Sequence, residues 1–156
     1  MNNEQILSIQ ENREQITSIC QQILDHVAPI ESEETSDFID EFIDLAAMDK
    51  SKVVSVSGSE SGGFGNEDVI IAVVVPIVVG VVKDLLVTFG KTKMSELQEA
   101  LASRKPQEVA SLIRVHANRV IEYQVDCSRS AKARAKMKEL KDSVARVLVG
   151  IFSHGS

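Results

Sequence analysis

Aromatic side chains and cysteines are scarce in this sequence of 156 residues. It contains no Trp, one Tyr and five Phe, so a folded core must be aliphatic, built from Val, Ile, Leu and Ala. The two cysteines, Cys20 and Cys127, form no CxxC pair, and no apolar stretch near the N-terminus resembles a signal peptide. We therefore expect two free, buried thiols rather than a disulfide framework.

The sequence also lacks the motifs that carry reaction chemistry. Gly90-Lys91-Thr92 matches the end of a P-loop, but Leu85 stands where the motif requires its first Gly. His26, His116 and His154 lie far apart without metal-ligand spacing, and no EF-hand order of acids occurs. We expect no enzyme activity, no cofactor and no small-molecule substrate, and we expect His116 to be a core or boundary histidine.

Charge is unevenly distributed along the chain, whose net charge is −6. Residues 1–68 carry 15 acidic and 3 basic side chains, a net of −12, whereas residues 69–156 carry 8 acidic and 14 basic ones, a net of +6. The negative total, and the lack of aromatic side chains among the C-terminal cations, argue against a nucleic-acid partner.

The acidic region, residues 1–50, has the pattern of two amphipathic helices. One is expected over residues 3–28, where apolar residues recur at spacings of three and four and Pro29 ends the helix. The other is expected over residues 33–48, with Ser32 as its N-cap and a solvated acidic face. The stripe of the first helix predicts packing against other helices, within the chain or between copies, and it consists of Ile6, Ile9, Arg13, Ile16, Cys20, Ile23 and Val27.

A Gly/Ser-rich linker, residues 51–68, precedes the most apolar segment of the chain, Val69–Phe89. The first fourteen residues of this segment have no polar side chain and eleven are Val or Ile, so it must enter a protein core or a bilayer. As a helix it would be about 31 Å long, which matches the hydrocarbon thickness of a membrane. Lys83 near its end shortens the uninterrupted run to a length that also fits a core helix. One slim face, where another helix can approach closely, comprises Ala72, Pro76 and Gly80 and extends to Asp84.

A basic helical region, residues 92–156, is expected to contain three helices. Ser95–Gln98 fits a capping box that opens a short helix, and Pro106 is well placed as the first residue of the next one. That helix should run to about Cys127, and Ser128–Ser130 is either a break or part of a continuous helix.

The last of these helices carries an apolar stripe and many cations. Together with the N-terminal stripe, its apolar residues predict self-association through Ile6, Ile9, Arg13, Ile16, Ile23, Met137, Leu140, Val144 and Val147. Its cations form a solvated face or contact anionic lipid or an acidic partner, and the residues concerned are Arg129, Lys132, Arg134, Lys136 and Lys138.

These patterns predict an all-α fold, a small bundle of about five helices around one very apolar central helix. The expected function is that of a non-enzymatic, membrane-associated protein, with a membrane-inserting or pore-forming role for Val69–Phe89. Membrane lipid is then a partner, together with further copies of the chain or another protein, and the basic C-terminal half would be cytoplasmic. The alternative is a soluble cytoplasmic adaptor that oligomerises through its stripes and opposite charges.

Overall fold

The computed structural model describes residues 11–27, 39–41, 43–44 and 66–153. The secondary structure within these ranges is helical, with no strand, and the labelled helices are α2 (Arg13–Val27), α5 (Asn66–Phe89), α6 (Met94–Ala102), α7 (Pro106–Cys127) and α8 (Ala131–Ser153). The all-α fold is therefore confirmed. The predicted positions Ile6, Ile9, Pro29 and Ser32 lie outside the described residues, as do residues 51–65 of the linker.

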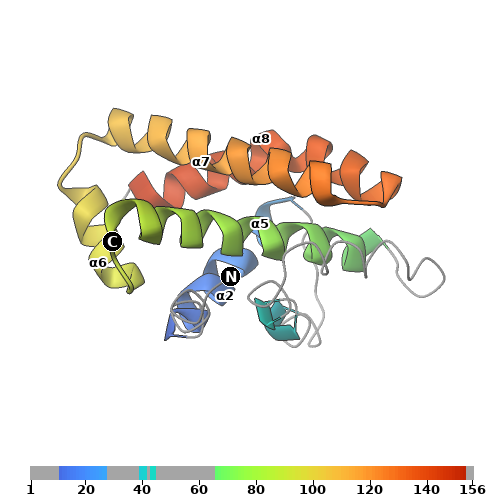
Figure 1. The fold of residues 1–156 in the computed structure, drawn as a ribbon, viewed down its shortest axis with the longest axis horizontal. Helices are drawn as coiled ribbons and strands as arrows, with labels where there is room; N and C mark the ends of the chain where they lie inside the picture. The colour runs from blue at the N-terminus through green and yellow to red at the C-terminus, as the bar shows by residue number, and fades with distance from the viewer. Residues whose placement is uncertain (1–10, 28–38, 42, 45–65, 154–156) are drawn as a thin grey trace.

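Four helices form the body of the molecule. Helix α2 contacts α5 and α8, α7 also contacts α5 and α8, and α5 and α8 contact each other. In Figure 1, α5 lies between α7 and α8 on one side and α2 and the short helical pieces at residues 39–41 and 43–44 on the other. Helix α6 closes one end of the bundle through contacts with α5 and α8. Helix α5 thus contacts every other labelled helix, which places it at the centre as predicted.

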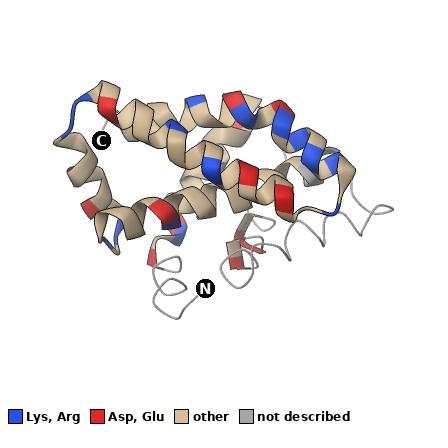
Figure 2. Ribbon diagram, turned by 45° about the horizontal axis from the view of Figure 1, so that its top comes forward, with Lys and Arg blue, Asp and Glu red and all other residues tan. Residues whose placement is uncertain are grey.

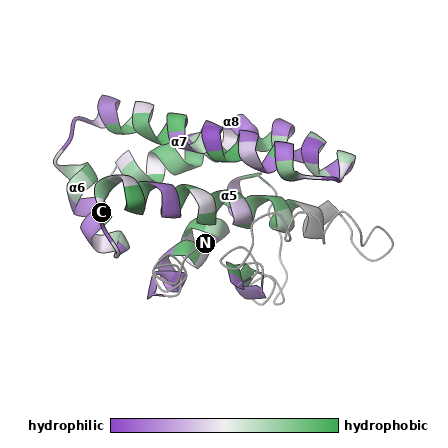
Figure 3. Ribbon diagram, viewed as in Figure 1, coloured by the Kyte–Doolittle hydropathy of each residue, from purple (hydrophilic) through white to green (hydrophobic). Residues whose placement is uncertain are grey.

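The central position of α5 explains why its sequence is apolar on every side. Every residue from Ile71 to Val82 is buried, and in Figure 3 much of the helix is coloured as hydrophobic. An ordinary surface helix keeps a polar stripe for solvent, but this segment has no solvent-facing side. Val and Ile form helices poorly in water, so burial rather than local propensity stabilises α5. The helix begins at Asn66, three residues before the predicted start, and passes through Pro76.

The boundaries of α7 and α8 follow signals in the sequence. Pro106 occupies the first turn of α7, which ends at Cys127, both as predicted. Helical structure is interrupted at residues 128–130, and α8 begins at Ala131. The break is stabilised by Ser130, whose Oγ accepts a hydrogen bond from the Ala133 N–H at 3.1 Å.

The predicted capping box of α6 is wrong. The helix begins at Met94, and the residue at its N-cap position, Lys93, makes no side-chain cap. The Met94 N–H instead donates to Oδ1 of Asn12, at 2.8 Å, from a residue more than eighty positions earlier in the chain. A distant side chain therefore satisfies the end of this helix, which local sequence could not indicate.

Candidate functional site

Part of the small-residue face of α5, at Gly80 and Asp84, contacts α7. At Gly80 a Cβ atom would lie only 2.7 Å from Cγ1 of Val120, so any larger residue would push the two helices apart. The predicted close approach at Gly80 is thus present, and α7 is the helix that uses it. One turn later in α5 and one turn earlier in α7, Asp84 meets His116, which shows that the two helices run antiparallel.

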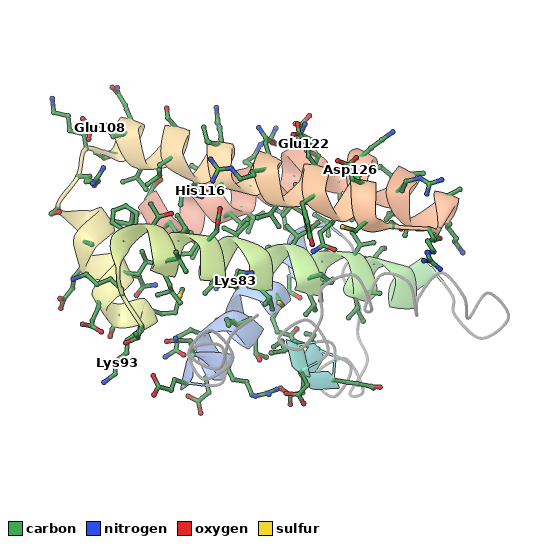
Figure 4. The ribbon with its side chains drawn as sticks, in the orientation of Figure 1. Lys83, Lys93, Glu108, His116, Glu122 and Asp126 are labelled. Carbon is green, nitrogen blue, oxygen red and sulfur yellow. The ribbon has the colours of Figure 1, made fainter. Side chains whose placement is uncertain are left out.

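Asp84 is the centre of a polar cluster between these two helices. Its Oδ2 lies 2.7 Å from Nδ1 of His116 and 3.5 Å from Nη1 of Arg119. His116 is only 4 % exposed and lies on α7 above α5, as Figure 4 shows, whereas Arg119 is open to solvent. A buried imidazole that is hydrogen-bonded to a carboxylate fixes the register of two helices. Neighbouring Lys83 is half-buried and also has an interaction partner.

The contacts of this cluster run between α5 and α7. No group of three or more His, Cys, Asp or Glu side chains that could hold a metal occurs in the described ranges. Thr88, one turn further along α5, donates its hydroxyl to the Asp84 backbone carbonyl oxygen at 2.7 Å, and the Asp84 carboxylate itself contacts only α7 among the contacts described above. The contacts therefore support an interhelical anchor.

A second set of polar contacts holds the N-terminal end of α2. Nδ2 of Asn12 donates to the Thr92 carbonyl oxygen at 2.8 Å, and its Oδ1 accepts from Met94 N–H at 2.8 Å, so one buried amide ties the start of α2 to the turn after α5. Arg13 pairs with Asp40, at 3.4 Å, and also with Asp44. Burial lowers the pKa of Arg13, but the hydrogen bonds and charges of Asp44 and Asp40 outweigh it and raise that pKa above its ordinary value.

The buried side of α2 is apolar. Facing the core are Ile16, Ile19, Cys20, Ile23 and Leu24. The Cys20 thiol is free and has no exposed surface, and burial raises its pKa because a thiolate would be poorly solvated there. Cys127 at the end of α7 is also free but is partly exposed.

The two predicted apolar stripes pack inside the chain. The residues Ile16, Ile23, Met137, Leu140 and Val144 are all buried in its own core. Val147 is half-buried, and it lines an open groove of about 630 Å³ between α2 and α8 together with Ile19, Met94 and Ile151. The helix packing that the stripes predict is thus satisfied within one copy, and self-association through them stays a prediction.

The cations at the start of α8 lie on the outer layer of the bundle, and Figure 2 shows them gathered toward one end. Arg129, Lys132 and Lys138 are exposed. Nη1 of Arg134 donates to the Ser128 carbonyl oxygen at 2.8 Å, and Lys136 pairs with Glu139 at 3.1 Å. Contact of this surface with lipid or an acidic partner stays a prediction.

By length and composition, α5 is a candidate membrane span. The stretch Ile70–Phe89 has 20 residues and a mean hydropathy of 2.6, and 83 % of its most apolar 18-residue window is buried inside the bundle. The core helix of a soluble protein meets the same criteria. Within the described residues it is the one such helix.

Two polar residues of the core were missed from the sequence. Asn12 has no signal beyond its place in an amphipathic helix. Gln124 lies on the apolar stripe of α7 and is fully buried, and neither of its amide atoms has a hydrogen-bond partner among the described residues.

Comparison with protein-family models, curated proteins and solved structures found no match.

Proposed function

We propose that this protein is a non-enzymatic, membrane-associating helical protein. In water its bundle is closed and carries α5 in the core as a helix of bilayer length. The observation that carries this proposal is the stretch Ile70–Phe89, which is long and apolar enough to cross a membrane. At 1.5 Å per residue it is about 30 Å long, close to the thickness of the hydrocarbon layer.

The charges near α5 are compatible with insertion. A charge at the centre of a membrane helix costs about 2.5–3.5 kcal/mol on insertion scales, but Lys83 and Asp84 lie toward one end, where the cost is smaller. The residues that follow α5 add the cations Lys91, Lys93, Arg104 and Lys105. By the positive-inside rule the C-terminal half would lie on the cytoplasmic side.

A soluble helical adaptor is the second candidate, and the distribution of polarity along α5 favours it. From Val69 to Val82 the helix has no polar side chain, and the bundle buries every residue from Ile70 to Val82. Beyond Val82 the helix carries both polar and apolar side chains and reaches solvent, with Val87 at 60 % exposure. This agreement between sequence and burial is what a permanent core helix requires.

Two matched substitutions separate these functions. Val87 in α5 is 60 % exposed and Val115 in α7 is 54 % exposed, so Asp at either position should change the stability of the closed bundle by less than about 0.5 kcal/mol. Only Val87 lies within the candidate span. If α5 inserts, Val87→Asp should reduce flotation with phosphatidylcholine–phosphatidylglycerol vesicles about fivefold, whereas Val115→Asp, with the same charge change, should bind like the wild type.

Equal binding by the two variants, or no vesicle binding by the wild type, would contradict the membrane function and favour the adaptor. Exposed positions are needed for this test, because the more central Val78 has no exposed surface. Val78→Asp would place an uncompensated charge in the core and unfold the bundle whether or not α5 ever meets lipid.

A further inference from the structure

The contacts that α5 makes with α7 and with α2 differ in chemistry, and therefore in whether lipid could take the place of the neighbouring helix. The contact with α7 is specific in shape and charge. Gly80 packs so closely against Val120 that a larger residue at position 80 would clash with it. Asp84 is hydrogen-bonded to His116 and lies beside Arg119. If α7 left, the Asp84 carboxylate would lose its partners while facing an apolar environment, which is unfavourable.

The contact with α2 is of the other kind. The residues that α2 turns toward the core are four aliphatic side chains and a thiol, as described above. Apolar contact is non-directional and depends on the area removed from water, so hydrocarbon of another source satisfies the same surface of α5. Lipid acyl chains are such a source.

The polar anchors of α2 described above lie at its beginning. Asn12 holds Thr92 and Met94 beyond the C-terminal end of α5, and Arg13 holds Asp40 and Asp44. The body of the helix, where Cys20 lies, has a wholly apolar inner side. Loss of one anchor therefore weakens the attachment of the whole helix to α5 and α8.

We propose that the lipid-contacting surface of α5 is the face covered by α2, and that α2 leaves this face at a phospholipid bilayer while α7 stays in place. This inference rests on the membrane function proposed above and specifies which surface meets the acyl chains. Once released, α2 has the apolar and polar faces of a helix that lies in the membrane interface. Lipid then contacts both the apolar side of α2 and the face of α5 that α2 covers in water.

Cys20 provides a reporter for this opening. It lies in the middle of the buried side of α2 with no exposed surface, so it reacts with N-ethylmaleimide only when α2 has moved away. In a Cys127→Ser protein the labelling rate reports on Cys20 alone. The reciprocal protein, Cys20→Ala, leaves Cys127 as a reporter on α7, the helix that should not move.

The test combines this reporter with loss of the Asn12 anchor. Asn12→Ala removes the hydrogen bonds to Thr92 and Met94 and should increase Cys20 labelling in water about tenfold, with the Cys127 rate unchanged. Vesicles of phosphatidylcholine with a minority of phosphatidylglycerol should raise Cys20 labelling of the protein with Asn12 intact as well. Val120→Ala is the control, because it weakens the α5–α7 contact and should lower stability in urea without a selective rise at Cys20.

The outcomes separate this inference from the function on which it rests. Vesicle binding with Cys20 still protected would overturn the inference and leave the membrane function standing. The inference would also be overturned if Cys20 labelling rose in Asn12→Ala and Val120→Ala only in proportion to their loss of stability in urea. In that case α2 would not open separately from the rest of the bundle. Opening of α2 without vesicle binding by any variant would overturn the membrane function, and with it the lipid partner.

Discussion

Two helical glycines have opposite surroundings, so the same substitution should have opposite effects at each. At Gly80 an added methyl group would collide with Val120, whereas at Gly150 in α8 nothing lies within 4 Å of the position that a Cβ would occupy. Gly in the interior of a helix costs about 0.5–1 kcal/mol relative to Ala. At Gly80 close packing explains why that cost is tolerated, but the described residues give no such reason at Gly150.

We therefore predict that Gly80→Ala lowers the free energy of unfolding by about 1–3 kcal/mol and that Gly150→Ala raises it by about 0.5–1 kcal/mol. Urea denaturation followed by circular dichroism measures both. In the double variant Gly80→Ala, Val120→Ala, the smaller partner makes room, so the loss should be less than the sum of the two single losses. Additive losses would show that Gly80 and Val120 do not contact each other.

Burial of Cys20 predicts a loss of stability in alkali. Its pKa is raised in the folded protein, so above about pH 9 the unfolded chain loses a proton that the folded chain keeps. The stabilising effect of the protonated thiol is fully present below that pH and is lost as the pH rises. We expect the free energy of unfolding to fall by up to about 1.4 kcal/mol per pH unit there. Cys20→Ala, measured in the same buffers, should lack this component, and parallel curves would show that Cys20 is accessible to solvent.

At the scale of elements, the charges in the first turn of α8 are unfavourable for a helix, so its start depends on the side-chain cap. The first turn of α8 has no acidic residue and is rich in cations, which the positive end of a helix dipole disfavours. Ser130 supplies the side-chain cap, through its bond from the Ala133 N–H.

We predict that Ser130→Ala lowers the free energy of unfolding by about 1 kcal/mol, while Ser130→Asp keeps it or raises it. Asp retains an oxygen acceptor and adds a negative charge beside the helix terminus and the nearby cations. Thermal denaturation of the three proteins gives the order. Similar stability of the Ala variant and the wild type would mean that this cap contributes nothing measurable.

Local signals were sufficient for the elements that they encode directly. The apolar run of α5 and Pro106 at the start of α7 set helices that the structure confirms within a few residues. The start of α6 could not be predicted in this way, because its cap is the side chain of Asn12. A hydrogen bond between residues this far apart in the sequence depends on the tertiary packing of α2.

At the scale of the whole molecule, the sequence indicated a central apolar helix but not its neighbours. Ala72, Pro76, Gly80 and Asp84 were predicted to share a face for helix packing, yet nothing local shows that His116 and Arg119 would meet Asp84. That meeting follows from the antiparallel register of α5 and α7. The same limit applies to the apolar stripes, because periodicity does not show whether a stripe packs within the chain or against another copy.

The long-range bonds of Asn12 also constrain the order of events during synthesis. Its partners Thr92 and Met94 lie 80 and 82 residues later in the chain. At roughly 5–20 residues per second, about 4–16 s separate the appearance of α2 from that of its anchor. Helix α5 likewise leaves the ribosome before α7 and α8 can cover it. If α5 meets lipid as proposed, the interval of translation is a period in which a nearby membrane would compete with the bundle for α5.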